Sequence, residues 1–142
     1  MTALVVDAGG LYAQADADEP RHSSVANLLR AEREEIVTTE LCVAEADYLI
    51  LDRLGVDVEL AFLEDLASGT FQVECLSNDE IGQARSLVER YRDLRIGLAD
   101  ASLAVLAARY ATNRILTFDE RAFRAITPLT GGSFLILPAD TQ

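Results

Sequence analysis

The chain has no lysine and no tryptophan, and it has only one histidine and two cysteines in 142 residues. Cys42 and Cys75 are far apart and lack any CxxC or Cys/His clustering, which argues against a zinc site and a disulfide framework. We expect both to be reduced, small core residues. His22 lies in a polar stretch far from any obvious nucleophile, so Ser/His/Asp or Cys/His catalysis has little support. We expect this histidine to be a solvated surface residue.

Long hydrophobic segments are also missing. No apolar run approaches the roughly 20 residues needed to span a bilayer. The chain enters Ala3-Leu4-Val5-Val6-Asp7 at once, without a basic region or a small-residue cleavage site. The sequence therefore predicts no transmembrane helix, no secretory signal and a cytoplasmic protein.

Positive charge is scarce. Twelve basic residues face 24 acidic ones, which gives a net charge of -12. Such a balance ordinarily discourages nucleic-acid binding, because phosphate affinity comes mainly from Lys and Arg. The objection weakens if several acids gather to hold divalent cations, since bound metals reverse the local potential. Every basic residue is arginine, which suits planar phosphate contacts, although codon bias would give the same pattern.

The remaining composition is that of an ordinary globular protein, half apolar and a quarter charged. The length is typical of one domain, and we expect a single domain over residues 1–142. Apolar patterning predicts strands over residues 3–6, 36–38, 71–75, 115–118 and 134–137. It predicts helices over residues 22–34, 39–54, 57–68, 81–91, 97–110 and 121–126. Gly55 is a stop signal for the second of these helices, and Ser77-Asn78-Asp79-Glu80 is a capping-box candidate that opens the fourth. Strands that alternate with helices indicate an α/β fold with a mostly parallel five-stranded sheet flanked by helices.

Three acids stand where such a sheet places its ligands. In open α/β sheets, binding sites lie beyond the carboxyl ends of the strands. Asp7 and Asp119 each follow an apolar strand, and Asp100 lies in the first turn of a helix. Each position also has a purely structural explanation, as a turn or capping aspartate or as an acid that favours the helix dipole.

Glu45 is the fourth acid. It follows Leu41 by four residues and precedes Tyr48 and Leu49 by three and four, so it lies along an apolar helical stripe. An ion pair with an arginine or a place at the edge of the stripe would explain it. One shared metal site explains all four acids together, and ligation by oxygen alone favours Mg²⁺ or Mn²⁺.

Four segments carry a family resemblance: Val5-Val6-Asp7 and residues 38–49, 97–101 and 116–123. In order and spacing they resemble the acidic motifs of PIN-domain ribonucleases, and most of all the VapC toxins of bacterial toxin-antitoxin pairs. The resemblance implies metal-site roles for the four acids and a supporting polar role for Thr117. Many members carry Ser or Thr after the first aspartate, where this chain has Ala8 and Gly9.

The same resemblance implies a function. It implies Mg²⁺-dependent endonucleolytic cleavage of a structured tRNA or ribosomal RNA loop that leaves a 5′-phosphate. It also implies a homodimer and a VapB-like antitoxin partner. Near the third motif, Arg92 and Arg95 are candidates for contacts with the RNA backbone, and a solvated helix end is the alternative. By the motif match, Glu40 is a helix-start acid and Asp47 an outward acid.

Other function classes fit less well. A phosphotransferase of the haloacid dehalogenase type needs a second aspartate two residues after the first, where Gly9 stands. A response-regulator receiver needs a lysine, and the chain has none. The remaining alternative is a catalytically silent PIN-like module that works through protein contacts.

Overall fold

A computed structural model describes residues 2–140 of the chain. The strands are β1 (Leu4–Val6), β2 (Ile36–Thr39), β3 (Gln72–Glu74), β4 (Arg114–Leu116) and β5 (Leu135–Leu137). The helices are α1 (Ala8–Ala15), α2 (His22–Ala31), α3 (Glu40–Leu54), α4 (Val56–Ala67), α5 (Asn78–Arg90), α6 (Gly97–Arg109) and α7 (Glu120–Ala125), with a 3₁₀ turn at Arg92–Leu94. The α/β alternation predicted from the sequence is confirmed.

The five strands form one sheet in the order β3-β2-β1-β4-β5, and each neighbouring pair is parallel. The sheet is therefore parallel throughout, where the sequence indicated a mostly parallel one. From β1 the chain builds outward first to β2 and β3, and then returns to add β4 and β5 on the other side. The strand order thus reverses between β1 and β4, which is where α/β sheets usually bind ligands.

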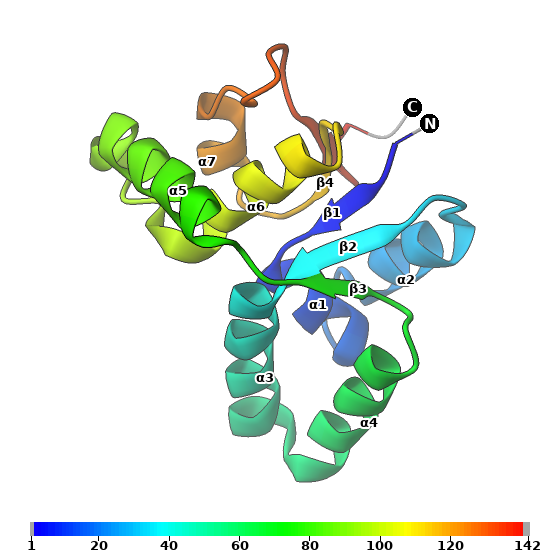
Figure 1. The fold of residues 1–142 in the computed structure, drawn as a ribbon. Coiled ribbons are helices and arrows are strands. Elements are labelled where there is room, and N and C mark those ends of the chain that lie inside the picture. The colour runs from blue at the N-terminus through cyan, green and yellow to red at the C-terminus, as the bar shows by residue number, and fades with distance from the viewer. Residues whose placement is uncertain (1, 141–142) are drawn as a thin grey trace.

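Helices cover both faces of the sheet (Figure 1). Helices α5, α6 and α7 lie on one side, α1, α2 and α4 lie on the other, and α3 leaves the carboxyl end of β2. The central strand β1 is fully buried, and so is most of α6. The all-round burial of α6 explains its alanine-rich, apolar sequence. Within residues 2–140 no helix has the length and apolar character needed to cross a membrane.

One helix is absent from the sequence prediction. Helix α1 begins directly after β1, and it contains the pair Gly9-Gly10, which resembles a turn. Gly10 is needed because α1 packs closely on the sheet. A Cβ at this position would collide with the side chain of Leu116 and lie 2.9 Å from Cγ1 of Val6.

Three side-chain predictions are wrong. Cys75 is exposed rather than part of the core, because β3 is an edge strand, whereas Cys42 is buried as expected. His22 is half-buried rather than solvated, and its Nδ1 lies 2.8 Å from the carbonyl oxygen of Ala13. Asp47 is not fully outward: it is half-buried, and its Oδ1 is shielded from solvent with no hydrogen-bond partner in the described part of the chain.

Candidate active site

Asp7 is the most buried of the four acids, with 7% of its surface exposed. It follows β1 and caps α1, because its Oδ1 accepts a hydrogen bond from the amide of Gly10 at 2.8 Å. Its Oδ2 accepts one from the hydroxyl of Thr117 at 2.5 Å. Burial raises the pKa of Asp7 to about 6 although both hydrogen bonds lower it, and the charges of Asp119 and Glu45 raise it further.

Thr117 connects two of the acids. Its hydroxyl donates to Asp7 and accepts from the backbone amide of Asp119 at 3.0 Å. Asp119 in turn caps α7 by accepting from the amide of Ala122 at 3.2 Å. These two hydrogen bonds are compatible with the supporting role predicted for Thr117. The capping explanation also holds for Asp7 and Asp119, and it coexists with their place in a shared cluster.

Asp100 comes to the cluster from the other side. It lies half-buried in the first turn of α6. Its pKa is raised to about 7, mainly by burial and then by the charges of Asp119, Asp7 and Glu45. A neighbouring arginine would have lowered this pKa instead. Asp100 is therefore surrounded by like charge.

Glu45 reaches the cluster from α3, but the reason given for it from the sequence is wrong. The buried face of α3 consists of Cys42, Ala46 and Ile50, whereas Leu41 and Tyr48 are 37% and 69% exposed. Glu45 therefore lies on an exposed face, where a carboxylate needs no special explanation. Its relevance comes instead from its position, because its charge raises the pKa of both Asp7 and Asp100.

Buried hydroxyl groups hold the strand ends beneath these acids. Thr38 donates to the carbonyl oxygen of Val6 at 2.8 Å, which ties β2 to β1. Thr39 and Ser102 share a hydrogen bond of 3.0 Å, which ties β2 to α6. Ser102 also donates to the carbonyl oxygen of Ala99 at 2.6 Å. The sequence analysis did not identify this layer, since no local pattern pairs residues so far apart in the chain.

The donor set is one that suits a hard divalent cation, because it consists of carboxylate oxygens gathered at one sheet edge. In the described residues no three His, Cys, Asp or Glu side chains already stand in an arrangement that holds a metal ion. Carboxylates without a cation between them repel one another, so a spread arrangement is expected. Asp7, Glu45, Asp100 and Asp119 are the groups that could hold an ion.

The predicted RNA-contact residues are not paired with these acids in the described residues. Arg92 is exposed in the 3₁₀ turn before α6, and Arg95 is exposed directly after that turn. In residues 2–140 neither forms an ion pair with one of the four acids. A different arginine is found beside the site: the guanidinium carbon of Arg21 lies 3.9 Å from the centroid of the Phe118 ring. Sequence reasoning missed this pair, whose members are 97 positions apart.

Comparison with known proteins agrees with this geometry. The sequence profile of the PIN domain family matches residues 4–127. Ribonuclease VapC26 of Mycobacterium tuberculosis is 43% identical over 135 residues, which cover 95% of this chain and all of that protein.

Solved structures show the same fold at lower identity. The crystal structure of M. tuberculosis VapC20, described as a sarcin-ricin loop cleaving toxin, superposes with a TM-score of 0.76 at 20% identity, covering 82% of this chain and 90% of that one. VapBC2 of Rickettsia felis, bound to a promoter DNA fragment, gives a TM-score of 0.67 at 16% identity over 89% and 95% of the two chains. With its profile match and its full-length VapC relative, this chain belongs to the PIN domain family, as a homologue of the VapC ribonucleases.

Proposed function

We propose that this protein is a metal-dependent endoribonuclease that hydrolyses phosphodiester bonds in structured RNA, either tRNA or rRNA, as the toxin of a type II toxin-antitoxin pair. The observation that carries the proposal is the cluster of Asp7, Glu45, Asp100 and Asp119 at the point where the strand order reverses. The neighbouring carboxylates raise the pKa of Asp7 and Asp100 there, and among residues 2–140 no arginine forms an ion pair with any of the four acids. Unpaired like charges in a partly buried site are typical of functional sites.

Asp7, Glu45, Asp100 and Asp119 would hold Mg²⁺, with Mn²⁺ as a possible substitute. When bound, such an ion activates a water and stabilises negative charge on a phosphodiester during in-line displacement. The chain's own contribution is to hold the acids in place. The hydroxyl of Thr117 and the amide of Gly10 fix the two oxygens of Asp7. Thr117 and the first turn of α7 fix the loop that carries Asp119. Attack of water on phosphorus with departure of the 3′-oxygen would leave a 5′-phosphate and a 3′-hydroxyl, and it needs no protein nucleophile.

The partners follow from the relatives. The structural neighbours include a toxin-antitoxin complex from Klebsiella pneumoniae and VapBC2 of R. felis. A VapB-like antitoxin is therefore proposed for this chain as well, and a homodimer is proposed from the family resemblance alone. An open reading frame next to its gene that encodes a short protein with a DNA-binding N-terminal segment would support the toxin role.

The decisive experiment is a cleavage assay with purified protein and bulk tRNA and ribosomal RNA. We expect cleavage with Mg²⁺ or Mn²⁺, 5′-phosphate ends on the products, and no cleavage after thorough treatment with EDTA. Undiminished cleavage after chelation would overturn the metal mechanism. No cleavage under any metal condition would favour the alternative, a catalytically silent PIN-like protein-binding module.

A further inference from the structure

Arg21 and Phe118 form a stacked pair that the proposed function does not use. Arg21 precedes the first residue of α2, and its guanidinium carbon lies 3.9 Å from the centroid of the Phe118 ring. An arginine over an aromatic face is held by attraction between its charge and the ring quadrupole. The side chain of Arg21 is nevertheless 52% exposed. It is thus a surface cation with a fixed position rather than a freely moving one.

The aromatic ring that holds this cation lies next to the acid cluster. Phe118 lies between Thr117, which donates to Asp7, and Asp119. A Cβ added to Gly9 would lie 3.4 Å from Oδ1 of Asp7 and 3.8 Å from Cδ2 of Phe118. The edge of the ring and the carboxylate of Asp7 therefore border the same small space over Gly9. Because Gly9 has no side chain to fill that space, the ring that holds Arg21 and the Asp7 carboxylate both border it.

Arg21 also has unused hydrogen-bond donors. Its Nε donates to Oε1 of Glu19 at 2.9 Å, which fixes the plane of the guanidinium group. Within residues 2–140 its two terminal nitrogens have no hydrogen-bond partner. These two nitrogens form the planar fork that matches the oxygens of a phosphate group. By contrast, several arginines elsewhere use their terminal nitrogens in ion pairs with acids of this chain, namely Arg85, Arg109, Arg114 and Arg124.

We infer that Arg21, held by Phe118 and Glu19, binds a phosphate group of the RNA strand next to the one cleaved at the acid cluster. The inference rests on the proposed function and adds a substrate-binding residue to it. A chain with a net charge of -12 repels RNA, and each phosphate that it binds needs a cation. The stacked arginine supplies one at the rim of the site, where the carboxylates themselves would repel the neighbouring phosphate.

The test measures how binding of a labelled RNA depends on salt. The probe is fluorescently labelled bulk tRNA with Mg²⁺, and the protein carries Glu45→Gln so that the RNA stays intact. Loss of one phosphate contact lowers the slope of log Kd against log salt by about 0.7–0.9. We expect this decrease, with several-fold weaker binding, for Arg21→Gln. The matched control is Arg33→Gln, which removes an exposed arginine from the opposite edge of the sheet and should leave the slope unchanged.

A second variant separates charge from geometry. Arg21→Lys keeps the positive charge but loses the fork, so the slope should stay near that of the parent while Kd takes an intermediate value. In the active protein, Arg21→Gln should raise KM and leave kcat nearly unchanged, because the contact is made in the ground state as well as in the transition state. Thermal melts check that each variant is folded.

The outcomes distinguish this inference from the proposed function. If the parent cuts RNA and Arg21→Gln has the same slope and KM as the parent, Arg21 binds no phosphate and only this inference is overturned. If the parent neither binds nor cuts RNA with any divalent metal, the proposed function is overturned and the phosphate site with it.

Discussion

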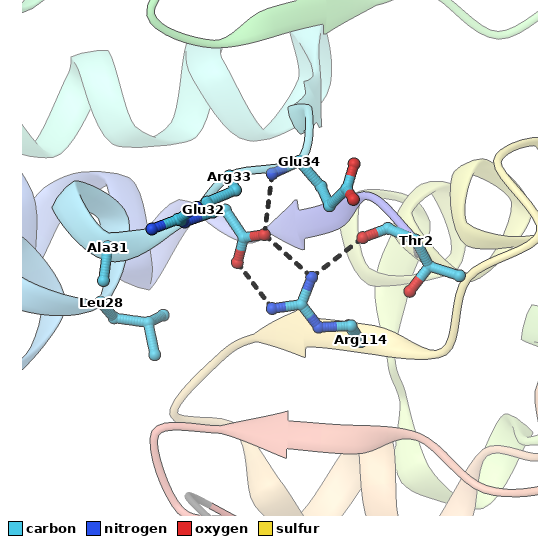
Figure 2. A pocket seen from close by; sticks show the side chains of 7 residues that line it. All are labelled: Thr2, Leu28, Ala31, Glu32, Arg33, Glu34 and Arg114. Carbon is cyan, nitrogen blue, oxygen red and sulfur yellow. Dashed lines mark hydrogen bonds and ion pairs between the residues drawn. The ribbon is translucent and has the colours of Figure 1, made fainter.

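Carboxylates at the two ends of the same sheet have opposite surroundings, and their pKa values are shifted in opposite directions. At the amino ends, Glu32 lines a shallow pocket of about 420 Å³ together with Arg114 and Thr2 (Figure 2). Both carboxylate oxygens of Glu32 accept hydrogen bonds from Arg114, at 2.6 and 3.1 Å, and this contact lowers the pKa of Glu32. At the carboxyl ends, Asp7 and Asp100 lie among other acids, and their pKa values are raised to about 6 and about 7.

The difference lies in whether the chain itself neutralises the acid. Glu32 is satisfied within the chain, because Arg114 supplies both the charge and the hydrogen-bond donors. The acid cluster has hydrogen-bond donors from Thr117 and Gly10 but no neutralising cation from the described residues. Both ends carry carboxylates, and the main difference lies in their surroundings. This lack of neutralisation is what the proposed cation site requires.

The largest effect is expected from removing an acid of the cluster at the carboxyl ends of the strands. Glu45→Gln should lower the rate of RNA cleavage by at least about 100-fold, since even outer partners of metal ligands typically contribute 10–100-fold. The fold should be intact because Glu45 is exposed. The control is Glu40→Gln, which removes an exposed acid from the first turn of the same helix. Cleavage by Glu45→Gln at the parent rate would make Glu45 an ordinary surface acid.

Removing the ion pair at the amino ends of the strands should change stability instead of activity. Arg114→Met leaves the carboxylate of Glu32, whose side chain is only 7% exposed, without its partner. We expect the free energy of unfolding to fall by about 2 kcal/mol, somewhat less than for a fully buried pair because Arg114 itself is 25% exposed. Urea denaturation measures this, with Arg33→Met as the control in the same pocket. RNA cleavage at a temperature where the variant is folded should not change.

A crowded acid and a paired acid should also respond to pH with opposite sign, and Asp100→Asn tests the crowded acid cluster. A folded-state pKa near 7 lies above the unfolded value, so protonated Asp100 favours the folded state at low pH. That contribution is full below about pH 4 and is lost as pH rises through 7. In EDTA at pH 8, Asp100→Asn should therefore be more stable than the parent by roughly 1–2 kcal/mol.

This advantage should disappear in acid and shrink with Mg²⁺, which stabilises the parent by binding its native state. Thermal melts of both proteins at pH 4 and pH 8, with EDTA or Mg²⁺, make the comparison. An Asp100→Asn protein that is less stable than the parent in EDTA at pH 8 would show that Asp100 is not crowded by like charge.

A smaller effect of opposite sign is expected from a paired acid. Arg109 and the capping box of α5 lower the pKa of Glu80 to about 2. A lowered pKa stabilises the fold above the unfolded value of about 4.3, and the contribution is lost as pH falls towards 2. Glu80→Gln should cost about 1 kcal/mol at pH 7 and almost nothing near pH 2. Denaturation at both pH values measures this, and an equal loss at both would exclude the ionic contribution.

Much of the fold was predictable because its signals are local. Apolar runs marked the five strands, and Gly55 and the Ser77 capping box marked a helix end and a helix start. Helix α1 was missed because Gly9 and Gly10 resemble a turn, and the need for glycine there comes from packing against β1 and β4. Local sequence cannot show that a distant strand fills the space over a residue.

The candidate site divides in the same way. The positions of Asp7, Asp100 and Asp119 follow from strand ends and a helix start, which the sequence displays. Glu45 was selected for two reasons, its place on an apolar stripe and its place in a family motif. The stripe proved to be exposed, so only the motif still supports the selection. The contact between Arg21 and Phe118 depends on how α2 packs beside the loop after β4, and no periodicity within either segment encodes it.

Asp7 ends a strand, caps a helix and anchors Thr117 with the same two oxygen atoms. This has a practical consequence for genetics. An inactive allele made at Asp7 would combine loss of chemistry with damage to the start of α1, so low protein levels in the cell could be mistaken for a harmless enzyme. An allele made at Glu45, which supports no other part of the fold among residues 2–140, would report on the chemistry alone.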